Sequence, residues 1–147
     1  MSTSPTTEPC LPGPLRHSYR FTAPNTGTTV KVTRDLVGAL LVTNGHGELT
    51  DTVRLLVSEV VTNVLQHTGA ALLTLDATIT PEAVTVRVTD REPGRRPVPP
   101  RSFPGDAAEG GRGLMLVDCL ADRWGVSVNE GFDPVSKSVW FALNGKG

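Results

Sequence analysis

The chain has 147 residues, of which 38% are hydrophobic and 20% charged, and its formal net charge is −1. This length suits one domain with its own core, and the near-zero charge excludes a general electrostatic attraction to nucleic acid or membranes. No apolar run reaches the roughly 20 residues of a membrane span, and the N-terminus lacks a secretion-signal pattern. We therefore expect a cytoplasmic globular protein that binds neither membrane nor nucleic acid directly, with Cys10 and Cys119 as free thiols.

The first two thirds of the chain contain five predicted elements after a polar tail. Residues 1–17 are rich in Ser, Thr and Pro, which predicts a disordered tail before a domain over 18–147. Alternation predicts a first strand over 19–23. Apolar residues at helical spacing predict helices over 28–43 and from about residue 50 to 67, with Thr50 or Asp51 as the cap of the second. Alternation then predicts strands over 73–77 and 84–88.

The last third begins with residues 91–111, which are rich in Gly and Pro and show no hydrophobic period. Such a long connection is often a lid over a site. A third helix is expected from Leu114 to a stop at Trp124 and Gly125, with Met115 and Trp124 in the core, followed by two strands around Val126 and Phe141. This order favours an α+β fold, a two-layer α/β sandwich with helices on one face of a mixed, mainly antiparallel sheet.

Glu59 and Asn63 lie four residues apart in the second predicted helix. This spacing puts them on one face, apart from the apolar stripe of that helix. The neutral oxygen of Asn63 suits Mg²⁺ held mainly by phosphates and water, and Glu59 could act as a general base. The same pair also fits a solvated helix edge without a function.

Asp90 ends the strand that contains Val84, Val86 and Val88, and it has the same parity as these valines. It should therefore point towards the buried face of the sheet. A carboxylate in that position needs a hydrogen-bond donor, and the amino group of adenine would serve as one. The alternative is an Asp that merely begins a turn.

A glycine-rich run, Gly110-Gly111-Arg112-Gly113, comes directly before the third predicted helix. Free backbone N–H groups and the positive end of a helix dipole favour phosphate binding there, and Arg112 could balance phosphate charge. The run is not a Walker loop, because no Gly-Lys-Ser/Thr follows it. A flexible loop end would have a similar sequence.

Taken in order, these motifs resemble those of the ATPase fold shared by DNA gyrase, Hsp90, histidine kinases and MutL, the Bergerat or GHKL fold. The segment Ser58–His67 resembles the N box of that fold, Val88-Thr89-Asp90 the start of its first glycine box, and Gly111–Val117 its second glycine box. The chain is most similar to anti-sigma factors of the RsbW and SpoIIAB type, and to stand-alone ATP-binding proteins of actinobacteria, which also share the motif at residues 120–125. The resemblance covers about residues 19–145.

The resemblance implies that the chain binds ATP with Mg²⁺. It implies that Asn63 holds the metal ion, that Glu59 is the base and that Asp90 binds the adenine amino group. The first glycine box would contribute Gly94, and the second would wrap the phosphates with Gly111, Arg112, Gly113 and Leu114.

One position departs from the family pattern Asp-x-Gly-x-Gly. Here the box reads Asp90-Arg91-Glu92-Pro93-Gly94, so Glu92 replaces a glycine. If that glycine needs a positive φ, Glu92 would resist it. We expect a lower ATP affinity or a different loop path, with adenine recognition by Asp90 retained.

The implied activity is that of an anti-sigma factor that is also a serine/threonine protein kinase. Its substrate would be an anti-anti-sigma factor of the STAS type, its second partner a sigma factor, and it would form a homodimer as relatives often do. The alternative is a nucleotide-binding or pseudokinase interaction module without phosphotransfer, which Glu92 favours. A detached histidine-kinase catalytic domain is a third interpretation, disfavoured because no helix pair with a phosphoacceptor histidine is present in the chain.

Overall fold

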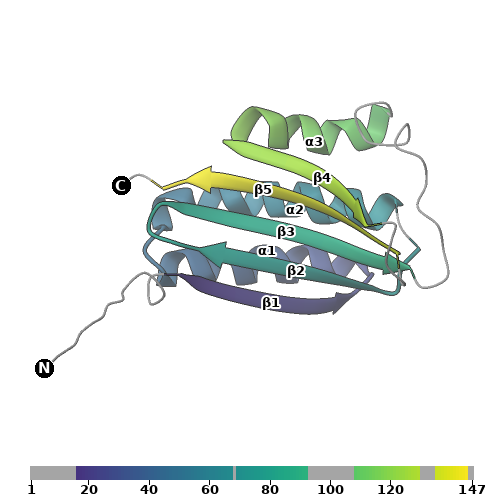
Figure 1. The fold of residues 1–147 in the computed structure, drawn as a ribbon, viewed down its shortest axis with the longest axis horizontal. Helices are drawn as coiled ribbons and strands as arrows, with labels where there is room; N and C mark the ends of the chain where they lie inside the picture. Colours follow the sequence, from purple (N-terminus) through teal and green to yellow (C-terminus); the bar gives the residue numbers. More distant parts are fainter. Residues whose placement is uncertain (1–15, 68, 93–107, 130–134, 146–147) are drawn as a thin grey trace, which may run out of the picture.

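The fold consists of one sheet and one layer of helices (Figure 1). A computed structural model describes residues 16–67, 69–92, 108–129 and 135–145. No helix within these ranges is long and apolar enough to cross a membrane. In chain order the elements are β1 (His17–Pro24), α1 (Gly27–Thr43), a 3₁₀ turn (Gly47–Leu49), α2 (Thr50–His67), β2 (Leu72–Ile79), β3 (Ala83–Glu92), α3 (Ala108–Leu120), β4 (Arg123–Asn129) and β5 (Val135–Asn144).

The sheet has the strand order β1-β2-β3-β5-β4, and every neighbouring pair is antiparallel. The α+β two-layer architecture is confirmed, whereas the expectation of a mixed sheet is wrong. The crossover through α3 makes β4 run in the same direction as β3, but β5 lies between these two strands. The two strands of like direction therefore never form a parallel ladder.

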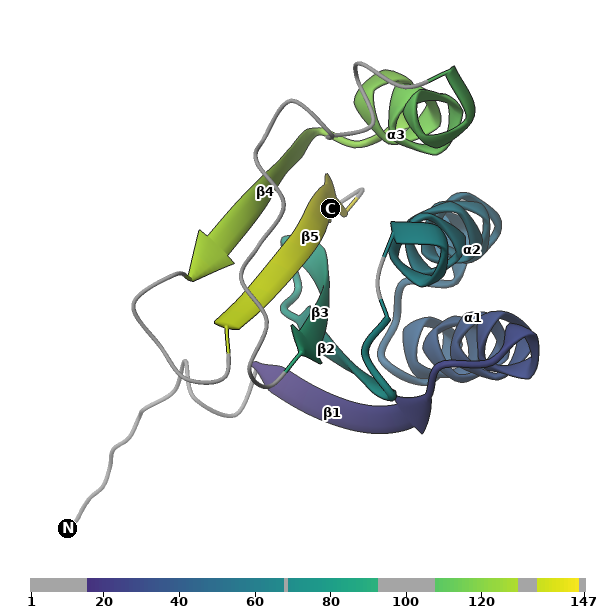
Figure 2. The same ribbon diagram turned by 90° about the vertical axis from the view of Figure 1, so that its right-hand side faces the viewer.

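All three helices cover the same face of the sheet, as the end-on view shows (Figure 2). Val84, Val86 and Val88 of β3 are fully buried and pair with Leu143, Phe141 and Val139 of β5, respectively. The predicted stripe of α2 packs against this sheet face. Its fully or almost fully buried members are Val53, Leu56, Val57, Val60 and Val64.

The core-facing side of α1 differs from the predicted one. Val32 and Leu36 are 45% and 39% exposed, while Thr29 and Thr33 are buried beside Val37. The hydroxyl of Thr33 donates to the carbonyl oxygen of Thr29 at 2.7 Å. A threonine whose hydroxyl is satisfied by the preceding helical turn can occupy a buried position, which hydrophobicity alone does not predict.

The start of α2 also differs from the prediction. Thr50 has helical backbone angles, φ −56° and ψ −49°, and its buried Oγ1 has no hydrogen-bond partner. It is therefore not an N-cap, because the 3₁₀ turn over Gly47–Leu49 runs directly into the helix. The predicted stop of α1 is confirmed, since Gly45 adopts a φ of +87° immediately after it.

Helix α3 ends at Leu120, earlier than predicted, and both Trp124 and Gly125 belong to β4. Met115 is 64% exposed, so its expected place in the core is wrong, whereas Trp124 packs partly against the core. Helix α3 contacts α2 and β4 at the edge of the layer. Within its described side chains, only Leu114 and Val117 are therefore buried.

Adjacent leucines in α2 test this packing. Leu56 is fully buried and Leu55 is 41% exposed. We expect Leu56→Ala to lower the free energy of unfolding by about 2–5 kcal/mol, because it leaves a cavity in the core. Leu55→Ala should change it by about 0.5 kcal/mol or less. Urea denaturation measures both, and equal losses would contradict the assigned helix orientation.

Candidate functional site

Three predicted motif segments converge at one end of the sheet. The C-terminus of α2 leads into β2, where Leu73 pairs with Asp90 of β3. Helix α3 has 13 residues and is about 20 Å long. It leads away from this end of the sheet, and β4, which follows it, leads back to the same end. Asn129, the last residue of β4, pairs with Ser136 beside the Asp90–Lys137 pair. The first turn of α3 and the end of β3 consequently lie at the same end of the molecule (Figure 1).

Asn63 and Glu59 occupy successive turns of α2 near this end. Asn63 is buried, with 6% of its surface exposed, so it is part of the packed interior rather than a solvated helix edge. Glu59 is half-buried and forms no hydrogen bond or ion pair within the described part of the chain. Its carboxylate is therefore free to accept a proton from a bound group.

Asp90 lies where the core-facing row of β3 ends. It is buried, with 5% of its surface exposed, and it continues the row of Val84, Val86 and Val88, as its parity predicts. Its Oδ1 accepts a hydrogen bond from the backbone N–H of Lys137 at 3.3 Å. A buried carboxylate needs such donors, and a carboxylate oxygen has further lone pairs with which to accept one from a ligand.

Lys137 is a site residue that the sequence analysis missed. It is the direct cross-strand partner of Asp90, and alternation places it on the helix-covered face as well. Only the register of β3 with β5 reveals this pairing. The two strands are separated by more than forty residues in the sequence, so no local signal could have predicted it.

The glycine-rich run lies inside α3, which begins at Ala108, rather than in a turn before the helix. The prediction that Gly111, Arg112 and Gly113 form a turn before the helix is therefore wrong, because they lie in its first two turns. Glycine adopts helical angles at a cost of about 1 kcal/mol relative to alanine, so a glycine run does not by itself prevent a helix. Leu114, one residue later, is a core residue with 5% exposure.

The segment after Asp90 continues as a strand. Arg91 pairs with Ser136 and Glu92 with Val135, so β3 extends through the position where the family pattern has a glycine. An extended backbone suits a non-glycine residue. Gly94 and most of the proposed lid lie outside the described residues, as do most of the tail over 1–17 and Cys10, whereas Cys119 is a free, exposed thiol.

The motif at residues 120–125 has a structural function in the turn between α3 and β4. Oδ2 of Asp122 accepts the backbone N–H of Asn144 at 2.7 Å, and Nε1–H of Trp124 donates to Oδ1 of Asp118 at 2.9 Å. These bonds fasten the start of β4 to β5 and to α3. This motif therefore positions the edge of the sheet instead of contributing ligands.

The donor set suits a metal ion that is carried by a nucleotide. Among the described side chains, no group of three or more His, Cys, Asp and Glu could hold a metal ion. A dedicated protein cage for Mg²⁺ is therefore absent from this part of the chain. One neutral amide, that of Asn63, fits a Mg²⁺ ion whose other ligands are phosphate oxygens and water.

Comparison with protein families agrees with this geometry. The sequence model of the histidine kinase-like ATPase domain matches residues 23–141, which includes all three motif segments. No curated protein matches the chain. Because the match covers most of the chain, the protein belongs to the histidine kinase-like ATPase domain family, a family of ATP-binding domains.

The strand at Glu92 yields a prediction. Glu92→Gly should raise ATP affinity, because it restores the backbone freedom of the family's glycine box. Glu92→Ala also removes the carboxylate but keeps a Cβ atom and hence the restricted backbone, so it should leave the affinity near the wild-type value. Isothermal titration with ATP measures both. Unchanged affinity in Glu92→Gly would show that the strand extension does not limit binding.

Proposed function

We propose that this protein is an ATP-dependent serine/threonine protein kinase that also acts as an anti-sigma factor. Its substrate would be a STAS-type anti-anti-sigma factor, its second partner a sigma factor that it sequesters, and it would act as a homodimer. Family membership supports nucleotide binding. The finer assignment is supported by the resemblance of the segments at Glu59, Asp90 and Gly111 to those of anti-sigma kinases.

The observation that carries the proposal is the placement of two buried polar residues at one end of the sheet. Asn63 and Asp90 are 6% and 5% exposed, and they belong to different layers of the fold. The amide of Asn63 and the carboxylate of Asp90, together with Glu59 one turn before Asn63 on α2, would provide a Mg²⁺ ligand, an acceptor for the adenine amino group and a general base.

The chemistry assigned to these residues is phosphoryl transfer. Asp90 would accept a hydrogen bond from the adenine amino group, and Asn63 would be the protein's ligand to Mg²⁺, which neutralises phosphate charge when bound. Glu59 would take the proton of the acceptor serine as the hydroxyl oxygen bonds to the γ-phosphorus and the bond from this phosphorus to the β–γ bridging oxygen breaks. The products are phosphoserine and ADP. Catalysis of this type depends mostly on positioning and charge neutralisation.

A second candidate function is nucleotide-dependent partner binding without phosphotransfer. The extension of β3 through Glu92 favours it, because a strand cannot also form the flexible glycine box of an active kinase. In this case the protein would bind ATP and its partner but transfer no phosphate. The two functions share Asn63 and Asp90 and differ in the role of Glu59.

Calorimetric titration with ATP, with and without Mg²⁺, tests nucleotide binding. Asn63→Ala should abolish the dependence on Mg²⁺, and Asp90→Asn should weaken ATP binding about tenfold or more, because it removes a charged acceptor for the adenine amino group. GTP, which lacks that amino group, should bind weakly to the wild type. Equal binding of ATP by wild type and Asp90→Asn would rule out the assigned adenine site.

Transfer of labelled phosphate from ATP to a serine of a STAS-domain protein tests the kinase activity. Glu59→Gln should reduce the transfer rate about 100-fold or more, since general-base catalysis contributes on that scale, while ATP affinity stays near the wild-type value. Glu82→Gln, which neutralises an exposed carboxylate in the β2–β3 turn, is the matched control. ATP binding without any serine labelling would favour the binding module.

A further inference from the structure

The sheet face opposite the helices presents a second surface. Every second residue of each strand points to this face, and most of these residues are Ser, Thr or Arg. None of the described helices covers this face (Figure 2). We call the part of this face formed by Ser18, Arg20, Asp76, Thr78, Arg87, Trp140 and Arg123 the outer face.

Trp140 is the only aromatic residue among these, and its indole lies across the neighbouring strand. It pairs with Arg87 on β3 and with Gly125 on β4. A Cβ atom added to Gly125 would meet Nε1 of Trp140 at 2.8 Å, so the missing side chain of Gly125 provides the space for the ring. The guanidinium of Arg87 lies 5.9 Å from the ring centroid, within range of a cation–π interaction.

Arg87 and Arg123 give the outer face positive charge that no ion pair between described residues neutralises. Arg20 is neutralised by Asp76, with Nε 2.6 Å from Oδ1, and this hydrogen bond raises the pKa of Arg20. No ion pair involves Arg87 or Arg123 among the described residues. Asp76 is thus the one carboxylate against three guanidinium groups on this surface.

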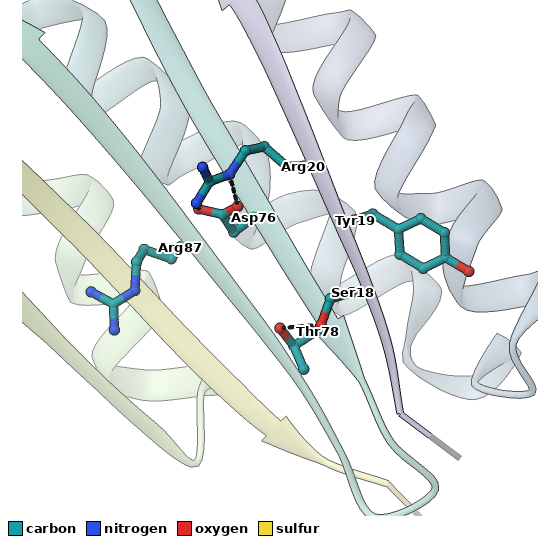
Figure 3. A pocket seen from close by; sticks show the side chains of 6 residues that line it. All are labelled: Ser18, Tyr19, Arg20, Asp76, Thr78 and Arg87. Carbon is teal, nitrogen blue, oxygen red and sulfur yellow. Dashed lines mark hydrogen bonds and ion pairs between the residues drawn. The ribbon is translucent and has the colours of Figure 1, made fainter. Parts of the chain in front are cut away.

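A depression of about 480 Å³ adjoins Arg87, lined also by Ser18, Arg20, Asp76 and Thr78 (Figure 3). Arg20 and Asp76 point towards each other across it, whereas Arg87 extends away from this pair, towards β5 (Figure 3). The hydroxyl oxygens of Ser18 and Thr78, which both line the depression, lie 3.5 Å apart. The lining therefore offers donors from hydroxyl and guanidinium groups next to a half-buried tryptophan.

We propose that the outer face is a docking surface for an acidic polypeptide segment, in which Arg87, stacked on Trp140, is the anchor. A partner carboxylate would pair with the guanidinium of Arg87, and an apolar side chain next to it would contact the indole. Trp and Arg are the residues most often found at the energetic centre of protein interfaces. This site lies on the opposite face of the sheet from Asp90 and does not depend on nucleotide binding.

Charge distinguishes this partner from two others. A second copy packed by its own outer face would bring the Arg87 and Arg123 side chains of both copies together, and like charges at an interface destabilise it. Single-stranded nucleic acid needs several aromatic platforms and a positive groove, whereas this surface has one tryptophan and the chain has a net charge of −1. An acidic protein segment satisfies both the guanidinium groups and the single indole.

The two tryptophans of the chain make the test specific for one face. Trp140 lies on the outer face, and Trp124 lies on the helix-covered face, where its Nε1–H is bonded to Asp118. We would titrate the full chain with a short peptide of alternating glutamate and leucine and follow both indole N–H signals by NMR. A peptide of alternating glutamine and leucine, and oligothymidine, are titrated separately for comparison.

The expected result is a shift of the Trp140 indole signal, but not of the Trp124 signal, with the glutamate peptide alone. Arg87→Gln should weaken binding about tenfold, as expected for a charge-assisted bond, and Arg123→Gln should weaken it by a smaller factor. Lys31→Gln makes the same charge change on α1, in the other layer, where Lys31 is 70% exposed at its side chain. It should leave binding within about twofold of wild type. Thermal melts confirm that the variants are folded.

Three results would overturn the proposal. If Arg87→Gln and Lys31→Gln weaken peptide binding equally, the peptide is attracted by the overall charge of the protein and not by a specific site. Tighter binding of oligothymidine would assign the outer face to nucleic acid. A Trp140 signal that depends on protein concentration without any peptide would assign it to a second copy.

Discussion

The two-residue period of β3 is the constraint on which the rest of the structure depends. Val84, Val86 and Val88 are each fully buried against the helices, and Asp90 is the next residue on the same face. A shift of register by one residue would turn the valines to the outer face and remove Asp90 from the interior. The apolar core and the position of the candidate ATP site are thus determined by the same alternation.

The helix layer completes the site because α2 is held by that core. Val60 and Val64 are buried against the sheet, and Asn63, between them in the sequence, is buried at the margin of the same contact. The stability of the hydrophobic stripe therefore fixes the orientation of the polar residues beside it. Binding residues on such a rigid helix need little ordering when a ligand arrives.

Periodicity in the sequence predicted the strands, the apolar stripe of α2 and the burial of Asp90 correctly, whereas the predicted buried residues of α1 and α3 were partly wrong. The α2 stripe and the alternating strands β2 and β3 were predicted correctly because burial there follows hydrophobicity. Thr33 is buried through a hydrogen bond to Thr29, and Met115 is exposed because α3 lies at the edge of its layer. Neither fact is visible without the tertiary arrangement. The sequence also did not predict which residues pair across neighbouring strands. The hydrogen bond from the backbone N–H of Lys137 to Asp90 joins residues that only the strand order β1-β2-β3-β5-β4 brings together.

The central claim is that ATP binds between α2, α3 and the end of β3. Mapping of backbone amide NMR shifts on addition of ATP with Mg²⁺ tests it most directly. We predict that the largest shifts occur at Asn63, Asp90, Leu114 and Lys137, and that Ser18, Arg20 and Thr78 on the outer face stay unchanged. Shifts confined to the outer face, or none at saturating ATP, would contradict the account.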